Sequence, residues 1–320
     1  MHETKSIWNK PAVMISTAVF CCVLWGSATP AIKIAYDLFQ IPASDTASRL
    51  VLAGARFQIA GIMIIAFGSL LKRKLLVPKK ESWGKIAVLA AFQTVCQYYF
   101  FFTALAHTTG VRGSVINASG NFLAILAAAY LFRMEKMTPR KWFGCIAGFL
   151  GIIILLGGFR AIFAGGNITL AGEGVMFMAG VFFALSGCCI KIFSKDEDPV
   201  VLSGYQFLLG GIVLFLIGTL MGGKLVFHSF GCVLNLLYMG FISAGAYTLW
   251  GILLKYNPVS SVSILGFLNP IMGVLLSALF LGEHQEAFSI NGLIALVLVS
   301  LGIIAINAEH RPEQEAEPAS

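Results

Sequence analysis

Residues 121–135 read NFLAILAAAYLFRME, and residues 269–283 read NPIMGVLLSALFLGE. Each stretch begins with asparagine, continues as an apolar run and ends with glutamate, and the two stretches lie 148 residues apart. The same offset also relates residues on either side, so that the matches are Tyr99 with Tyr247, Val111 with Val259, Asn121 with Asn269, Glu135 with Glu283, and Gly144 with Gly292. The chain therefore contains two copies of one unit, and this repeat decides its fold.

Earlier parts of the two copies also match, at slightly larger offsets. Residues 32–34 and 190–192 both read IKI and lie 158 residues apart. At an offset of 150 the matches are Phe57 with Phe207, Gly61 with Gly211, Ile62 with Ile212, and Gly68 with Gly218. Chance does not easily supply an ordered series of this length, so the repeat covers most of the chain.

The composition places both copies in a membrane. Of the 320 residues, 58% are hydrophobic and 12% are charged, whereas soluble domains carry about 25% charged residues. Apolar runs of about 20 residues recur along the chain, and a helix of that length crosses the hydrocarbon core of a bilayer. They predict ten transmembrane helices, at 13–35, 50–71, 85–106, 112–132, 141–159, 173–193, 201–221, 231–254, 260–281 and 289–307.

We therefore expect an all-α integral membrane protein with ten transmembrane helices arranged as two inverted five-helix repeats. Repeat 1 spans 13–159 and repeat 2 spans 173–307, and we expect the acidic tail at 308–320 to be disordered. Because five is an odd number, the second copy enters the membrane from the opposite side. Inverted repeats are typical of secondary transporters, in which a site near the midplane opens to either side in turn.

The distribution of basic residues predicts the orientation, because Lys and Arg accumulate on the cytoplasmic side of membrane proteins. With both termini inside, the inner segments hold 15 of these residues, and the outer segments hold four, namely Arg49, Arg112, Arg160 and Lys224. The sequence predicts a multi-pass protein of the plasma (inner) membrane with both termini in the cytoplasm. The first run, 13–35, is too long for the apolar core of a signal peptide, so we expect it to be retained as a helix.

Several functional classes find no support in the sequence. Lys and Arg lie between the apolar runs and form no basic helix face, so we expect no nucleic-acid partner. The seven cysteines lie in or beside apolar segments without a CxxC motif, and the five histidines lie in predicted loops or tails, so we expect no metal and no cofactor. The helices contain no nucleophile with its base and no paired carboxylates, so we expect no enzyme.

Three stretches show a resemblance to a known family. The first helix contains LWGSATP at 24–30, the second contains ARF at 55–57, and the fourth ends in EKMTPRKWFG at 135–144. Repeat 2 returns to this ending with LGE at 281–283. The chain resembles the EamA-type members of the drug/metabolite transporter superfamily over residues 13–307. The resemblance implies a ten-helix carrier with a central cavity, often an exporter of amino acids or related metabolites, although residues 284–289 replace the Thr-Pro turn in repeat 2.

Polar and aromatic side chains within the apolar runs are the candidates for substrate contact, because polar groups are costly in lipid and usually face a cavity or another helix. Asn121 and Asn269 are repeat mates near the middles of their helices, and Asn117 shares a helix face with Asn121. Packing between helices is the alternative role for this pair. The remaining candidates are two amides, Gln93 and Gln97, and four aromatic residues, Trp25, Tyr99, Tyr247 and Trp250, whose alternative role is also packing.

Two Lys–Glu combinations are candidate gates. Lys33 and Glu283 are expected near the outer ends of their helices, and Lys191 and Glu135 near the inner ends. We hypothesise that one pair breaks as the other forms, and the alternative is that each lysine extends to the membrane surface. Arg56 is a third cation within an apolar run, which either attracts an anionic group or reaches lipid headgroups.

These observations predict a secondary transporter that moves a small polar metabolite by alternating access. Several cations and no central acid favour an amino acid or a related zwitterion or anion, and the family resemblance favours export. A non-transporting membrane sensor or scaffold is the alternative function. The expected partners are the substrate and the bilayer. The GxxxG motif of Gly144 and Gly148 suits either a homodimer or packing inside the monomer.

Overall fold

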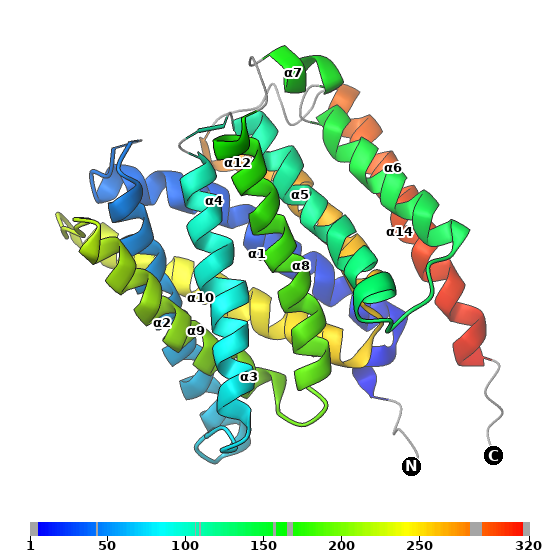
Figure 1. The fold of residues 1–320 in the computed structure, drawn as a ribbon, viewed down its shortest axis with the longest axis horizontal. Coiled ribbons are helices and arrows are strands. Elements are labelled where there is room, and N and C mark those ends of the chain that lie inside the picture. The colour runs from blue at the N-terminus through cyan, green and yellow to red at the C-terminus, as the bar shows by residue number, and fades with distance from the viewer. Residues whose placement is uncertain are drawn as a thin grey trace.

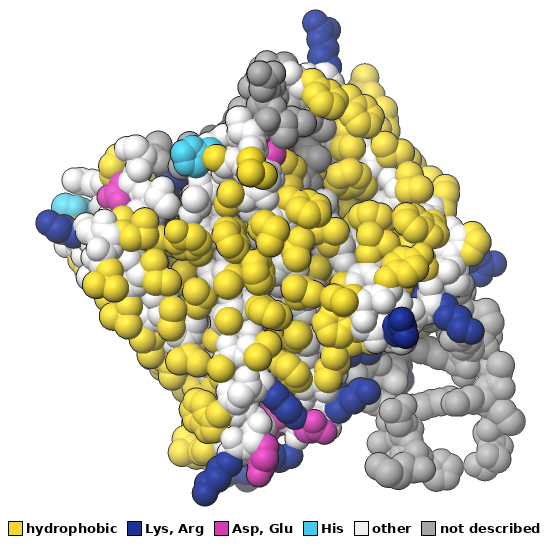
Figure 2. Space-filling view, viewed as in Figure 1, with side chains coloured by type: hydrophobic (Ala, Val, Ile, Leu, Met, Phe, Trp, Pro, Cys, Tyr) yellow, Lys and Arg dark blue, Asp and Glu magenta, His cyan; other side chains and the backbone are white. Residues whose placement is uncertain are grey.

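The structure, a computed structural model, is a bundle of helices (Figure 1). It describes residues 6–42, 44–105, 107–108, 110–155, 158–164, 169–281 and 290–315. All regular secondary structure in these residues is helical, which confirms the all-α prediction. Figure 2 shows that hydrophobic side chains cover the middle of one face, whereas charged side chains gather at its edges, as expected for a surface in contact with lipid.

The helices of the first copy coincide with the predicted apolar runs. They are α1 (Pro11–Leu38), α2 (Thr46–Lys72), the continuous helix made of α3 (Ser82–Leu89), η2 (Ala90–Cys96) and α4 (Gln97–Leu105), then α5 (Gly110–Leu126) with η3 (Ala127–Leu131), and α6 (Pro139–Leu155). The segments η2 and η3 are π-helical. There are also two short helices: η1 (Ile7–Asn9) lies outside the predicted runs, and α7 (Gly158–Ala164) begins at the end of the predicted run 141–159.

The second copy has the same order of helices. They are η4 (Leu170–Gly174) with α8 (Val175–Phe193), α9 (Pro199–Leu220), α10 (Phe230–Tyr256), the broken helix made of α11 (Val259–Ser263), η5 (Ile264–Phe267) and α12 (Leu268–Leu281), and α14 (Ile290–Glu315). Polar caps fix where helices begin. For example, Asp198 caps α9 by accepting a hydrogen bond from Val200 N, and Pro199 occupies the first helical position.

Within the described residues, seven helices are long and apolar enough to cross a membrane. They are Pro11–Leu38, Thr46–Lys72, Ser82–Ala104, Leu170–Phe193, Pro199–Leu220, Phe230–Tyr256 and Ile290–Ala308. Two further apolar helices, Ile116–Leu131 and Val259–Gly273, are shorter. These helices establish a multi-pass arrangement. The count of ten spans additionally requires the shorter helices and α6, which has 17 residues.

The contacts between helices follow the repeat. Helix α1 packs on α10 and α12, and its counterpart α8 packs on α4 and α5, the counterparts of those two helices. Helix α2 packs along its own counterpart α9, and α6 packs along its counterpart α14 (Figure 1). Each major contact therefore has a mate in the other copy, as two interlocked copies related by a pseudo-two-fold axis require.

Glycines allow α2 and α9 to lie in close contact. A methyl group on Gly54 would come within 2.8 Å of the Gly211 carbonyl oxygen, and one on Gly61 within 2.7 Å of the Gly204 carbonyl oxygen. At the same crossing the rings of the repeat mates Phe57 and Phe207 stack with centroids 5.1 Å apart and planes 1° apart. Parallel stacking of equivalent residues is expected where the pseudo-two-fold axis passes between them.

The GxxxG motif of α6 packs against other helices of the same chain. Gly144 lies against the Gly302 carbonyl oxygen and Ile306 of α14, and Gly148 lies against the ring of Phe267. These contacts are the packing alternative stated above. Both glycines are buried within the chain, and a homodimer through this motif stays a prediction.

The end of α14 differs from the prediction. Residues 308–315 continue the helix to Glu315 in place of the expected disordered segment, and residues 316–320 lie outside the described part of the chain. Three of these eight residues are glutamate, which is a good helix former. The acidic composition alone therefore did not end the helix.

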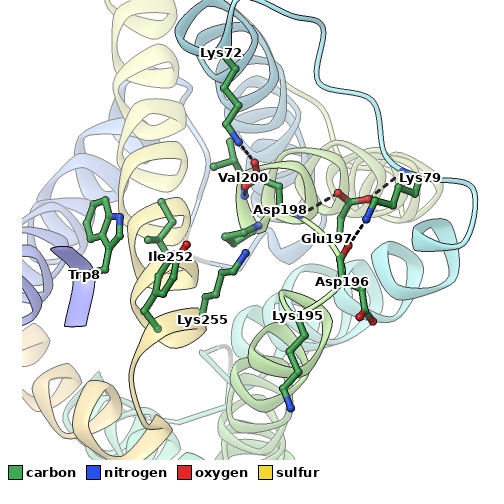
Figure 3. Close-up of a pocket in the computed structure, with 12 residues that line it drawn as sticks. Trp8, Lys72, Lys79, Lys195, Asp196, Glu197, Asp198, Val200, Ile252 and Lys255 are labelled. Atoms are coloured by element: carbon green, nitrogen blue, oxygen red, sulfur yellow. Dashed lines mark hydrogen bonds and ion pairs between the residues drawn. The ribbon is translucent and has the colours of Figure 1, made fainter. Parts of the chain in front are cut away.

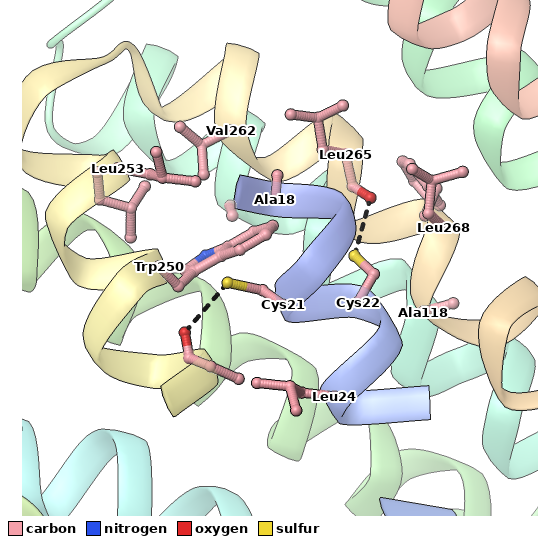
Figure 4. Close-up of a cluster of buried hydrophobic side chains, with 14 of the residues drawn as sticks. Ala18, Cys21, Cys22, Leu24, Ala118, Trp250, Leu253, Val262, Leu265 and Leu268 are labelled. Carbon is pink, nitrogen blue, oxygen red and sulfur yellow. Dashed lines mark hydrogen bonds between the residues drawn. The ribbon is translucent and has the colours of Figure 1, made fainter. Parts of the chain in front are cut away.

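The cysteines serve packing. All seven are free thiols, and six of them are buried. In the cluster shown in Figure 4, the Cys21 thiol donates to the Ala246 carbonyl oxygen at 3.5 Å and the Cys22 thiol donates to the Leu265 carbonyl oxygen at 3.4 Å. These contacts join α1 to α10 and to the broken helix of the second copy.

Candidate functional site

Six aromatic side chains from five helices meet where α1, α2, α4, α9 and α10 converge. This aromatic cluster consists of Trp25, Phe57, Tyr98, Phe207, Tyr247 and Trp250. The ring centroid of Trp25 lies 5.1 Å from that of Tyr247 and 5.0 Å from that of Trp250. The hydroxyl groups of Tyr98 and Tyr247 share a hydrogen bond of 2.8 Å, which joins the two copies. The structure thus brings together Trp25, Tyr247 and Trp250, three of the predicted substrate contacts.

Arg56 of α2 is a buried cation beside this cluster. It is 5% exposed, and its Cζ lies 4.6 Å from the ring centroid of Phe57 and 5.2 Å from that of Tyr98. Its Nε has no hydrogen-bond partner, and no ion pair among the described residues includes it. Ring faces attract a cation, but a buried charge without a counter-charge is costly.

The repeat explains why Arg56 has no partner. The residue at the same position in the second copy is Gln206, whose amide donates to Gln93 Oε1 at 3.0 Å and accepts from Thr94 Oγ1 at 2.7 Å. At the offset of 148, the residues that correspond to Gln93 and Thr94 are Phe241 and Ile242. Neither has a polar side chain, so Arg56 lacks the partners that Gln206 has.

Two more polar atoms at the aromatic cluster lack partners. The indole Nε1 of Trp25 and the amide Oε1 of Gln97 are buried and make no hydrogen bond to the part of the chain that the structure describes, and Gln97 lies beside the Tyr247 hydroxyl. Together with Arg56 Nε, the cluster therefore presents two donors and one acceptor that the chain leaves unsatisfied. Buried polar groups are normally paired, so such a set at one place indicates a position for a ligand.

Other predicted contacts have partners within the protein. Gln93 is bound to Gln206, as described above, and its amide oxygen is therefore occupied. Tyr99 is half-buried and packs on Phe100, with ring centroids 5.8 Å apart. Tyr99 also packs on the buried core that contains Phe57, Phe207 and Tyr247.

The asparagines lie apart from the aromatic cluster. Asn121 is 7% exposed, its Nδ2 donates to the Ala118 carbonyl oxygen at 3.4 Å, and its Oδ1 lies against Gly266 of the broken helix. Asn269 is half-buried and Asn117 is exposed. Among the described residues no hydrogen bond connects these three asparagines to the aromatic cluster. The contact with Gly266 favours helix packing for Asn121, although its Oδ1 has no hydrogen-bond partner.

Both members of the inner gate pair are bound by other groups. Glu135 accepts from Lys141 Nζ at 2.9 Å and from Ser260 N at 3.2 Å, whereas Lys191 Nζ donates to the carbonyl oxygens of Leu254 at 3.1 Å and Asn257 at 2.5 Å. Glu135 and Ser260 belong to different copies, so their bond ties the copies together. Of the outer pair, Lys33 is exposed on α1, and Glu283 lies outside the described residues.

Three features of the site escaped the sequence analysis. Tyr98 stands between two candidates, Gln97 and Tyr99, and only the helix register shows that its ring faces the cluster. Arg56 was identified as a cation in an apolar run, but its burial against rings depends on the crossing of α2 with α4. The sequence did contain a signal for Gln206, because at the offset of 150 this amide stands where the first copy has the cation Arg56.

Comparison with known proteins supports the helical repeat and points to transport. The model of the EamA-like transporter family matches residues 12–157 and 170–308. An uncharacterized transporter of Synechocystis is 28% identical over 88% of this chain and 86% of its own length. A protein of Salmonella typhimurium described as a probable amino-acid metabolite efflux pump is 25% identical over 88% of this chain and 91% of its own length. One crystal structure has the same fold, with a TM-score of 0.73 and 20% identity over 92% of this chain and 98% of that chain.

Proposed function

The chain belongs to the EamA-like transporter family, and on that basis we propose that it is a ten-span secondary transporter for a small metabolite with a carboxylate, best fitted by an amino acid. The observation that carries this proposal is the set of unsatisfied groups at the aromatic cluster, above all the buried and unpaired Arg56.

A carboxylate satisfies the two donors. Arg56 offers a planar fork that matches a carboxylate, and charge-assisted bonds of this kind are the strong ones in a dry site. Trp25 Nε1 is a second unpaired donor of the aromatic cluster. The substrate would thus remove the cost of an uncompensated buried cation, which gives the empty carrier a reason to bind an anion.

An ammonium group satisfies the acceptor. Gln97 Oε1 has a free acceptor position, and the ring faces of the aromatic cluster attract a cation. An amino acid carries its ammonium and carboxylate groups on the same carbon atom, so one molecule can pair with both the unsatisfied donors and the unsatisfied acceptor of the cluster. An aliphatic or aromatic side chain would pack on the rings.

The arrangement of helices supports alternating access. Each major helix contact has its mate in the other copy, so the same contacts can exchange between two related states. We further propose export across the plasma membrane, with both termini in the cytoplasm. Support for this direction comes from the distribution of Lys and Arg and from the relative described as a probable efflux pump.

Counterflow in proteoliposomes tests the proposal. Purified protein is assayed with labelled amino acids, with their methyl esters and with the corresponding amines, so that the carboxylate is the variable. We expect the free amino acids to exchange and the esters and amines to be at least about 30-fold poorer, the loss typical of removing one partner of a buried charged pair.

The Arg56→Gln variant is expected to lose the same preference, whereas Lys80→Gln removes an exposed charge outside the site and is the control. Thermal unfolding of each variant shows whether it is folded. Equal transport of esters and acids, or unchanged transport in folded Arg56→Gln, would contradict the proposal. If no solute moves and none raises the Tm, a sensor or scaffold function takes its place.

A further inference from the structure

A cationic cavity lies where two apolar helices end. It has a volume of about 340 Å³ and is lined by Phe132, Arg133, Met134, Lys191, Ile192 and Lys195. The span that contains α8 ends at Phe193, and the apolar helix that contains η3 ends at Leu131. Among the described residues the lining of the cavity contains three cations and no carboxylate, which gives the cavity a positive potential at the level of lipid headgroups.

The carboxylates next in sequence to the lining residues are bound by other groups. Glu135 is held by Lys141 and Ser260, and Asp196 is paired with Lys85 at 2.6 Å. Glu197 accepts from Ser82 Oγ at 2.7 Å and from a backbone N–H. None of these three acidic groups lines the cationic cavity.

Lys195 also lines a second cavity, of about 460 Å³, whose lining includes Asp196, Glu197 and Asp198. Figure 3 shows the Lys195 side chain directed away from Asp196 and Glu197. Lys195 and Arg133 are both exposed, and each can turn toward an anion in the cationic cavity. Lys191 adds charge beside them while it donates to backbone carbonyl oxygens.

The surface next to the cavity suits acyl chains. Tyr130 is 60% exposed and Leu131 is 65% exposed, and both precede the cavity on the same helix. A ligand that placed an anion between Arg133 and Lys195 would lay any attached apolar chain against these two side chains. A free anion would gain the charge contacts alone.

We propose that this cavity binds the phosphate of an anionic phospholipid, with Arg133 and Lys195 on the phosphate and the acyl chains along Tyr130 and Leu131. The site is separate from the aromatic cluster, so it stands whether or not the proposed substrate is correct. A lipid held here would brace the junction of η3 with the end of α8, next to the Glu135 contact between the copies.

Native mass spectrometry of the full-length protein in detergent tests the site, with phosphatidylglycerol and phosphatidylcholine of identical acyl chains as probes. The test variant combines Arg133→Asn with Lys195→Gln. Asparagine is chosen because residue 133 has a φ of 51°, a conformation that asparagine tolerates. The matched control combines Lys74→Gln with Lys80→Gln, which removes the same charge from exposed lysines that line neither cavity.

We expect phosphatidylglycerol to bind in preference to phosphatidylcholine, and to bind about 30-fold more weakly to the test variant but not to the control. Thermal unfolding gives a second readout, in which phosphatidylglycerol raises the Tm of the wild type and of the control only. Equal binding of the two lipids, or an equal loss in the control, would overturn the proposal. Inorganic phosphate that raises the Tm as much as the lipid would also overturn it, because the cavity would then be a site for a free anion.

Discussion

At the scale of single residues, one position has diverged between the two copies. Position 56 holds arginine and position 206 holds glutamine, although both lie on helices that pack as repeat mates. Gln206 is fully buried and bonded on both sides, whereas Arg56 is buried and unpaired. The two copies supply two equivalent positions, and the lack of polar partners at one of them leaves a buried charge, which we propose binds the substrate.

The hydrogen bonds of Gln206 lead to a prediction about stability. Gln206→Leu leaves Gln93 Oε1 and Thr94 Oγ1 buried without partners, and we expect a loss of about 1–3 kcal/mol. The triple variant with Gln93→Leu and Thr94→Val removes all three groups and should recover most of that loss. Thermal unfolding in detergent compares the two. A triple variant less stable than the single one would show that the three side chains matter for their shape and not for their hydrogen bonds.

Glu135 predicts a pH dependence. Burial raises the pKa of this carboxyl group, but the hydrogen bonds from Ser260 and Lys141 outweigh burial and leave the pKa below its ordinary value of 4.5. Because the pKa is lower in the folded than in the unfolded protein, the ionised group stabilises the fold above pH 4.5 and loses this effect as the pH falls through the lowered pKa.

The measurement is the difference in Tm between the wild type and Glu135→Gln as a function of pH. We expect the wild type to be more stable at neutral pH and the difference to shrink as the pH falls below 4.5. All other carboxyl groups titrate in both proteins, so their contribution cancels in the difference. A difference that stays constant with pH would show that Glu135 acts without its charge.

At the scale of elements, the contact of α2 with α9 depends on glycine. A Cβ on Gly54 would lie 2.4 Å from Phe215 N and 2.7 Å from Phe215 Cα, and backbone atoms cannot move aside as a flexible side chain can. Gly54→Ala is therefore expected to cost about 1–3 kcal/mol by forcing the helices apart. Gly84→Ala is the matched control, because nothing lies within 4 Å of its new methyl group. There we expect a gain of about 0.5–1 kcal/mol from helix propensity, and equal effects of both changes would contradict this interpretation.

The elements themselves were largely predictable from the sequence, because a helix that crosses lipid must be apolar over its length. Each predicted run contains a helix, and the repeat offsets paired Phe57 with Phe207 before the structure showed them stacked. Side-chain partners were not predictable in the same way. Arg56 and Tyr98 meet only because α2 crosses α4 at one height, and the π-helical turn of η2 shifts the residues that face the crossing.

At the scale of the whole molecule, links between distant loops hold each end of the bundle. At one end Lys79 N donates to Glu197 Oε2 at 3.0 Å, which joins the loop after α2 to the loop after α8. At the other end Lys224 N donates to Ser48 Oγ at 2.9 Å, which joins the loop after α9 to the start of α2. The loop after α2 corresponds to the loop after α9 in the other copy, and the loop after α8 corresponds to the segment that leads into α2. Each link therefore has a counterpart at the other end of the bundle, as the inverted repeat requires. Under the proposed alternating access, we expect one of these links to break while the other stays formed.

The proposed topology is tested by labelling single cysteines with a reagent that does not cross membranes. Six native cysteines are buried and Cys96 is half-buried, so we expect little background. Lys80→Cys and Lys195→Cys should react from the cytoplasmic side, and Lys224→Cys from the opposite side.

Figure 1 places the start of α1 and the end of α14 at the same end of the bundle, so tags on both termini should be accessible from the cytoplasm. Ten spans are even in number, whereas the seven long helices alone would place the termini on opposite sides. Tags accessible from opposite sides would therefore contradict ten spans, and labelling of Lys80→Cys and Lys224→Cys from one side would contradict the inverted arrangement.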